Sequence, residues 1–209
     1  MHRILLGVVF ALLLYHLLKP KPNQKFLIIG SAPYMRDWVP KHLKWFLRNG
    51  YQVATFNNSW KLVPIEHISY WFDSGEHDKK GTFIPNKHEE ARMNKIHTTD
   101  TDPSAKYFYT KPMKSTMLFN VLYHFMYIHL TEPCTLVVVG CDMQYTKEGD
   151  TFYSHLKNSK AANDPINRLG ESHLERELES SNSHGFKMYN ASTEAKTRLP
   201  YPRFRDHLS

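Results

Sequence analysis

The sequence predicts an α/β fold: a single Rossmann-like domain with a mostly parallel sheet, preceded by one apolar transmembrane helix. Residues 26–29 (FLII) are fully apolar and stop at Gly30, which is typical of a buried strand in a parallel sheet. Residues 36–49 place apolar side chains at helical spacing and end at Asn49-Gly50. Residues 51–56 (YQVATF) follow as a second strand. A strand, a glycine turn, a helix and another strand in this order predict the opening of a Rossmann-like unit.

The rest of the chain continues the alternation of strands and helices. We expect, in chain order, a strand over 65–72, an apolar helix over 115–130 with Ser115 as its N-cap, a buried strand over 135–139, a glutamate-rich helix over 169–181 and a strand over 187–190. Residues 73–114 are polar throughout, and we predict mostly loop there, with one short helix near 87–95. A basic, proline-containing tail follows the last strand.

The N-terminus predicts a membrane anchor. Residues 4–18 (ILLGVVFALLLYHLL) carry no formal charge and lie between Arg3 and Lys19. As a helix they would cover about 22 Å at about 1.5 Å per residue, against a hydrocarbon core of about 30 Å. A thin membrane or snorkelling lysines would close that gap. A cleaved signal peptide and a buried helix are the alternatives, although no small-x-small cleavage site follows. The predicted organisation is an anchor over 1–19, a linker over 20–25 and a domain over 26–209.

Charge and cysteine content restrict the classes of function. The net charge is +7, of which four charges lie in the acid-free segment 1–25, so the remainder carries +3. This excess suits an anionic small ligand and is too small to indicate a nucleic-acid groove. The only two cysteines, Cys134 and Cys141, exclude a disulfide framework and argue against a cysteine-based zinc site.

Small and polar residues follow three of the predicted strands. These segments are Gly30-Ser31-Ala32-Pro33, Asn57-Asn58-Ser59 and Gly140-Cys141-Asp142. In an open parallel sheet, ligands bind beyond the carboxyl ends of the strands, so the three segments should meet at one edge. The Gly30 turn would direct backbone N–H groups at a phosphate, and an asparagine would read a base or ribose. Each segment taken alone is also compatible with an ordinary turn.

Three further patterns could carry chemistry. His173 and Glu177 are four residues apart on a predicted helix, so the carboxylate could orient the imidazole as a general base; a solvated helix face is the alternative. The loop after Asp142 contains Tyr145 and Tyr153, whose hydroxyls could hold a phosphate, or which could belong to an ordinary aromatic loop. Asp100-Thr101-Asp102 has the Asp-x-Asp pattern of a divalent-cation site, but it does not follow an apolar strand.

Taken in order, these segments resemble the sialyltransferases over about residues 26–190. The matching stretches are Phe26-Leu27-Ile28-Ile29-Gly30-Ser31-Ala32-Pro33, Thr55-Phe56-Asn57-Asn58, Lys114-Ser115-Thr116-Met117-Leu118, Val137-Val138-Val139-Gly140-Cys141-Asp142, and His173 with Glu177. The resemblance implies that Gly30, Ser31 and Ala32 hold the nucleotide together with Asn58 or, alternatively, Asn57. It further implies donor contacts from Ser115 and Thr116, binding roles for Gly140 and Asp142, and phosphate contacts from Tyr145 and Tyr153. His173 would be the catalytic base, oriented by Glu177.

The function implied by this resemblance is transfer of a sugar, sialic acid or a related keto-sugar acid, from a CMP-linked donor to a glycan acceptor. Neither a metal nor a separate cofactor is expected, and no nucleic-acid partner. Two alternatives stay open: metal-dependent diphosphate transfer through Asp100 and Asp102, and a non-catalytic anchored nucleotide-binding module. The charges around the anchor leave its orientation open. The resemblance favours a lumenal domain in the Golgi or endoplasmic reticulum, where Asn57-Asn58-Ser59 and Asn190-Ala191-Ser192 are potential glycosylation sequons.

Overall fold

The computed structural model describes most of the predicted sheet and the helix that follows its first strand. The described residues are 23–73, 95–97, 107–108, 134–142, 186–193 and 197–204, together with Leu118, Val121, Leu122 and Phe125. Within this part, no helix has the length and apolar character needed to cross a membrane. The predicted anchor at residues 4–18 lies outside the described residues.

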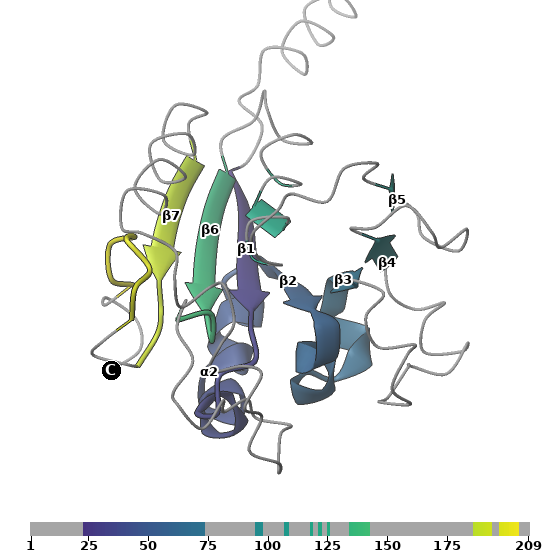
Figure 1. Ribbon diagram of the computed structural model, residues 1–209, viewed down its shortest axis with the longest axis horizontal. Helices are drawn as coiled ribbons and strands as arrows, with labels where there is room; N and C mark the ends of the chain where they lie inside the picture. Colours follow the sequence, from purple (N-terminus) through teal and green to yellow (C-terminus); the bar gives the residue numbers. More distant parts are fainter. Residues whose placement is uncertain are drawn as a thin grey trace, which may run out of the picture.

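The core of the fold is a seven-stranded sheet whose strands all run parallel, in the order β5-β4-β3-β2-β1-β6-β7 (Figure 1). The strands are β1 (Gln24–Ile29), β2 (Tyr51–Phe56), β3 (Ile68–Asp73), β4 (Lys95–His97), β5 (Tyr107–Phe108), β6 (Cys134–Val139) and β7 (Phe186–Asn190). The chain builds outward from β1 to β2 and β3 and later returns to the other side of β1 with β6 and β7. The order therefore reverses between β1 and β6, and this is the topological switch point of the sheet.

These observations confirm the predicted α/β class with a parallel, Rossmann-like sheet. The strand predicted over 51–56 has the same bounds as β2, and those predicted over 135–139 and 187–190 each begin one residue later than β6 and β7. The first helix, α2, spans Met35–Arg48 and so begins and ends one residue before its predicted bounds. The apolar runs were sufficient to predict these strands. Asn49-Gly50 was sufficient to predict the end of the helix, because Gly50 adopts a φ of 78° that favours glycine.

Two predictions in the middle of the chain were wrong in detail. The strand expected from residue 65 begins only at Ile68, because Ile65–His67 after Pro64 form a short 3-10 helix. The segment 73–114, expected to be mostly loop, contributes β4 and β5 to the sheet, whereas the helix predicted near 87–95 lies, apart from Lys95 of β4, outside the described residues. β4 pairs with β3 over three residues only, so neither strand is long enough to show an apolar or alternating pattern.

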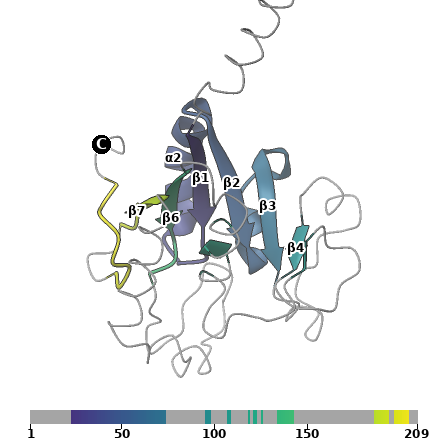
Figure 2. The same cartoon turned by 90° about the horizontal axis from the view of Figure 1, so that it is seen from above.

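Side chains of the central strands point alternately into two cores. On one face, Leu27 and Ile29 of β1 pack with Met35, Trp38 and Phe46 of α2. Figure 2 shows α2 beside β1 at this side of the sheet. On the other face, Phe26 and Ile28 pack with the helical residues Leu118, Val121, Leu122 and Phe125. These four lie at positions i, i+3, i+4 and i+7, the spacing of one helix face, and all are buried. Because β1 is covered on both sides, its sequence is apolar without alternation.

The C-terminal segment, residues 197–204, packs along the edge of the sheet. Leu199 and Tyr201 are buried in the same core as Phe26, and Arg203 forms a parallel bridge with Asn190 of β7. The Phe204 ring contacts the rings of Trp45, Phe46, Tyr51 and Tyr189. The sequence suggested only a basic tail here, but its aromatic and leucine side chains complete the domain.

Both cysteines are buried, free and separated by the length of β6, which makes stability sensitive to alkaline pH. Burial raises the pKa of Cys134 to about 12 and that of Cys141 well above its usual value of 9.0. In the unfolded chain both thiols ionise from about pH 9, so above that pH the unfolded state is favoured by up to about 1.4 kcal/mol per pH unit for each thiol.

We therefore expect the free energy of unfolding to fall between pH 9 and pH 10.5, by about 2 kcal/mol for each thiol. Guanidinium unfolding at pH 8, 9 and 10.5 measures this fall. In Cys134→Ala the fall in the free energy of unfolding should be smaller by the part that Cys134 contributes. Exposed lysines titrate equally in the variant and the wild type, so the difference between the two profiles excludes their effect. Identical pH profiles for the variant and the wild type would contradict the expected raised pKa.

Candidate functional site

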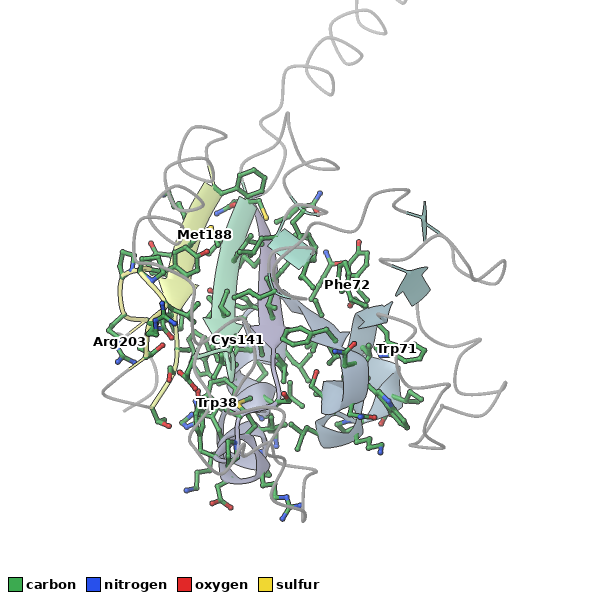
Figure 3. All side chains as sticks on the ribbon, in the orientation of Figure 1. Trp38, Trp71, Phe72, Cys141, Met188 and Arg203 are labelled. Atoms are coloured by element: carbon green, nitrogen blue, oxygen red, sulfur yellow. The ribbon has the colours of Figure 1, made fainter. Side chains whose placement is uncertain are left out.

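The carboxyl ends of β2, β1 and β6 lie side by side, and they bring together the three segments that the sequence placed at one edge. β1 pairs with β2 on one side and with β6 on the other, so the Gly30 turn lies between Asn57-Asn58 and Gly140-Cys141-Asp142. Figure 3 shows Cys141 at the end of β6, with Trp38 of α2 below it and Arg203 of the C-terminal segment beside it. The switch point of the sheet is therefore surrounded by the predicted site residues of the described part.

The turns after β1 and β6 are bonded directly to each other. The Gly30 N–H donates to the Val139 carbonyl at 2.8 Å, and the Ala32 N–H donates to the Gly140 carbonyl at 3.1 Å. A Cβ built on Gly30 would lie 2.2 Å from the Gly140 oxygen, so glycine is needed for this approach. Gly140 has a φ of 72°. These contacts differ from the expected phosphate cradle, because the N–H groups of Gly30 and Ala32 are bonded to the end of β6, and among the described residues only the Ser31 N–H of this turn has no backbone hydrogen bond.

The segment after β2 begins a 3-10 helix, Asn57–Leu62, instead of a simple turn. Asn57 adopts a φ of 47°, and its carbonyl accepts a hydrogen bond from Trp71 Nε1 at 2.9 Å. The buried Ser59 hydroxyl accepts the Phe56 N–H at 2.9 Å and lies 2.7 Å from the Ile29 carbonyl, to which it can donate. Ser59 thereby fixes the start of this helix to the ends of β1 and β2.

Asn58 is a buried polar residue at this edge. It is 4% exposed, and no hydrogen bond joins its side-chain amide to another residue of the described part. Most buried polar side chains in folded proteins have a hydrogen-bond partner. Of the two asparagines that the sequence left as alternatives, Asn58 is the one with its full amide bonding capacity available to a ligand.

Asp142 belongs to a hydrogen-bond network that the sequence did not reveal. Gly140 N–H donates to the Tyr34 hydroxyl oxygen at 3.1 Å, Tyr34 donates to Ser192 Oγ at 3.0 Å, and Ser192 Oγ donates to Asp142 Oδ1. The Ser192 N–H in turn donates to Asn190 Oδ1 at 2.8 Å. The network connects the start of α2 with the loops after β6 and β7.

The electrostatic setting keeps Tyr34 protonated. Burial raises the pKa of Tyr34 well above its usual value, and the neighbouring Asp142 carboxylate raises it further. Tyr34 therefore acts as a hydrogen-bond donor throughout the neutral pH range. Tyr34 and Ser192 were not among the predicted site residues. Ser192 was noted only as the third residue of the potential glycosylation sequon Asn190-Ala191-Ser192. In the folded domain this triplet is buried, and the Asn190 amide is bonded to Thr197 and Ser192.

The other predicted site residues lie outside the described residues: His173, Glu177, Ser115, Thr116, Tyr145, Tyr153, Asp100 and Asp102. Within the described part, no three His, Cys, Asp or Glu side chains are grouped as a metal site would require. Comparison of the chain with protein-family models, curated proteins and solved structures finds no match.

Proposed function

We propose that this chain is a glycosyltransferase that binds a CMP-linked sugar at the carboxyl edge of its sheet and transfers the sugar to a glycan acceptor. The observation that carries the proposal is the Asn58 amide, which is buried beside the switch point of a parallel sheet and has no hydrogen bond to another described residue. Ligands of such sheets bind at this point. An amide there supplies a donor and an acceptor together, which matches the edge of a cytosine base.

The remaining roles follow the resemblance to sialyltransferases. Ser31 would approach the nucleotide phosphate, and its N–H forms no backbone hydrogen bond with another described residue. Tyr145 and Tyr153 would stabilise the leaving phosphate by hydrogen bonding, the electrostatic role that a metal plays in other transferases. His173 would deprotonate the acceptor hydroxyl with Glu177 orienting its ring. The anchor predicted at residues 4–18 would hold this activity beside membrane-bound or secreted acceptors.

A thermal-shift series on the purified full chain tests the proposal with CMP, UDP, GDP and their sugars. We expect CMP and its sugar to stabilise the chain by about 2.7 kcal/mol at 100 times the dissociation constant. Preferential stabilisation by UDP or GDP would overturn the assignment of the donor nucleotide. An absence of stabilisation by every nucleotide would overturn the nucleotide site itself.

Asn58→Ala should separate ligand binding from folding. Because no hydrogen bond joins the Asn58 amide to another described residue, we expect the free energy of unfolding without ligand to be unchanged or higher. The dissociation constant for CMP should rise at least tenfold, because the variant loses about 1.4 kcal/mol or more of hydrogen bonding to the ligand. Urea unfolding with and without CMP measures both quantities.

The matched control is the adjacent buried residue, Ser59, whose hydroxyl is fully bonded to Phe56 and Ile29. Ser59→Ala should destabilise the ligand-free chain by about 1–3 kcal/mol, because it leaves buried backbone groups without a partner. If Asn58→Ala destabilised the ligand-free chain to the same extent and bound CMP normally, the Asn58 amide would have a structural role only.

A further inference from the structure

The amino ends of β1, β6 and β7 lie together at the end of the sheet opposite the candidate site (Figure 1). Lys25 of β1 and Lys187 of β7 both pair with Thr135 of β6, so the three residues form one row across the sheet. Residues of such a row point to the same face, which for Lys25 is the face of Leu27 and therefore of α2. Lys187 is exposed and Lys25 is partly exposed. The two lysines are separated by two strand spacings, about 10 Å.

The last turns of α2 add two basic residues at the same edge. Lys44 and Arg48 are exposed and lie one turn apart on the same face of the helix. Arg48 is the last residue of α2, and Lys25 Nζ donates to the carbonyl of the next residue, Asn49, at 3.3 Å. The end of α2 therefore lies beside the row of β1. We call Lys25, Lys44, Arg48 and Lys187 the basic edge.

Two partly exposed apolar residues flank the basic side chains of α2. Successive residues of a helix are rotated by about 100°, so Trp45 lies on one side of Lys44 and Arg48, and Leu47 lies on the other. The Trp45 ring also contacts Tyr51 of β2. Indole and leucine side chains beside lysine and arginine are typical of protein surfaces that lie at a membrane–water interface.

The acidic residues of the described part lie away from the basic edge. They are Asp37, Glu66, Asp73 and Asp142. Asp37 belongs to the first turn of α2, Asp73 ends β3 and Asp142 follows β6, so these three are at the carboxyl edge of the sheet. Glu66 precedes β3, which is two strands away from β1. The described strands β1, β6 and β7 and the second half of α2 therefore carry basic residues without an acidic one.

The length of the predicted linker brings the basic edge close to a membrane. The anchor is predicted over 1–19 and β1 begins at Gln24, so the chain between them covers at most about 18 Å. Lipid headgroups occupy about 5–8 Å of that distance, which leaves about 10–13 Å to the amino end of β1. Charges at this edge are then close to one Debye length from the headgroups, about 8 Å at physiological ionic strength. The carboxyl edge is about 17 Å farther away along the strands, where such interactions are screened.

We propose that the basic edge docks on anionic phospholipid headgroups of the membrane that holds the anchor, with Trp45 and Leu47 at the interface. Docking in this way directs the carboxyl edge with Asn58 away from the membrane. The inference rests on the predicted anchor but on neither the nucleotide site nor the transfer reaction. Anionic phospholipids are concentrated in the cytoplasmic leaflet, so docking favours a cytoplasmic domain, whereas the resemblance favours a lumenal one and the charges flanking the anchor decide for neither.

The test uses the full chain in lipid nanodiscs, with a fluorophore on a cysteine introduced at Gln52. This residue is exposed near the start of β2, and labelling selects it because Cys134 and Cys141 are buried. Lipids with a spin label on the headgroup quench the fluorophore of docked chains, which gives the ratio of docked to undocked chains. We expect this ratio to be higher in discs of phosphatidylcholine with phosphatidylserine than in phosphatidylcholine alone. It should fall at about 1 M salt, where the Debye length is about 3 Å.

Arg48→Gln should lower the ratio of docked to undocked chains about fivefold, the contribution of one basic residue near an anionic surface. Arg48→Lys keeps the charge and should keep the wild-type ratio. The matched control is Arg36→Gln, which removes the other exposed arginine of α2, about 18 Å away at about 1.5 Å per residue. Arg36 lies at the carboxyl edge, so this variant should dock as the wild type does.

Equal quenching with and without phosphatidylserine would overturn the role of anionic lipid. Equal losses in Arg48→Gln and Arg36→Gln would overturn the assignment to the basic edge, because net charge alone would then explain docking. A fluorophore on Asp37→Cys, at the carboxyl edge, should be quenched less than the one at Gln52, and equal quenching would show that the domain presents no preferred face. Chains that do not enter the discs would refute the anchor and the docking together. CMP takes no part in these measurements, so the proposed function stands or falls by its own thermal-shift series.

Discussion

Gly30→Ala should destabilise the folded domain by about 3 kcal/mol or more, a large part of the 5–15 kcal/mol that typically stabilises a domain. The new Cβ would lie 2.2 Å from the Gly140 oxygen and 2.5 Å from Cys141 Sγ. The first of these atoms belongs to backbone that cannot withdraw without breaking the hydrogen bond from Ala32 to Gly140. Chemical denaturation followed by circular dichroism measures the loss; an insoluble variant would agree with it.

Gly50→Ala is the matched control, because it also adds one methyl group to a glycine at the end of a secondary-structure element. Gly50 has a φ of 78°, but a Cβ there would meet no atom within 4 Å. Its cost is therefore conformational only, about 1–2 kcal/mol. Equal stability of the Gly30→Ala and Gly50→Ala variants would show that the two turns can separate, and the close approach at the switch point would be refuted.

His173→Ala should reduce transfer by at least about 100-fold and leave CMP binding nearly intact. Loss of a general base costs about 10²–10⁴-fold in rate, whereas a group that acts on the acceptor hydroxyl contributes little to holding the nucleotide. Initial rates with a CMP-sugar and a glycan acceptor give the first quantity, and calorimetry with CMP gives the second. Glu177→Gln should cause a smaller loss of rate, since that side chain only orients the imidazole.

His67, an exposed histidine of the described part, supplies the control. His67→Ala should retain the wild-type rate, because His67 lies in the 3-10 helix before β3 and has no place in the proposed chemistry. Full turnover by His173→Ala would eliminate His173 as the base. Turnover that is lost on addition of excess chelator would favour the alternative that uses Asp100 and Asp102.

The parallel sheet was predictable because each of its central strands is an apolar run that can be recognised in the sequence by itself. β1, β2 and β6 are buried along most of their length, so their apolar runs are visible in the sequence without reference to any partner. The alignment of Gly30, Asn58 and Asp142 at one edge followed from topology alone, because parallel strands place their carboxyl ends together. The short strands β4 and β5 offered no such signal, as they consist of three and two residues.

The contacts that shape the candidate site were not predictable in the same way. Tyr34 and Ser192 are 158 positions apart, and Ser192 and Asp142 are 50 apart, so no local pattern relates them. Backbone bonding of Gly30 and Ala32 to the end of β6 likewise depends on two strands separated by most of the described chain. The composition of the C-terminal segment suggested a tail, and only its packing shows that Phe204 and Leu199 belong to the cores.

The bond between Tyr34 and Ser192 has a consequence for the order in which the protein is made. A ribosome adds about 5–20 residues per second, so the 158 residues between these partners take about 8–30 s to synthesise. Until Cys134–Val139 have been made, β1 has β2 on one side and an unpaired edge on the other. The contacts that join the loops after β6 and β7 to the start of α2 therefore form last, and chains interrupted before residue 192 lack the hydrogen bonds of Ser192 to Tyr34 and Asp142.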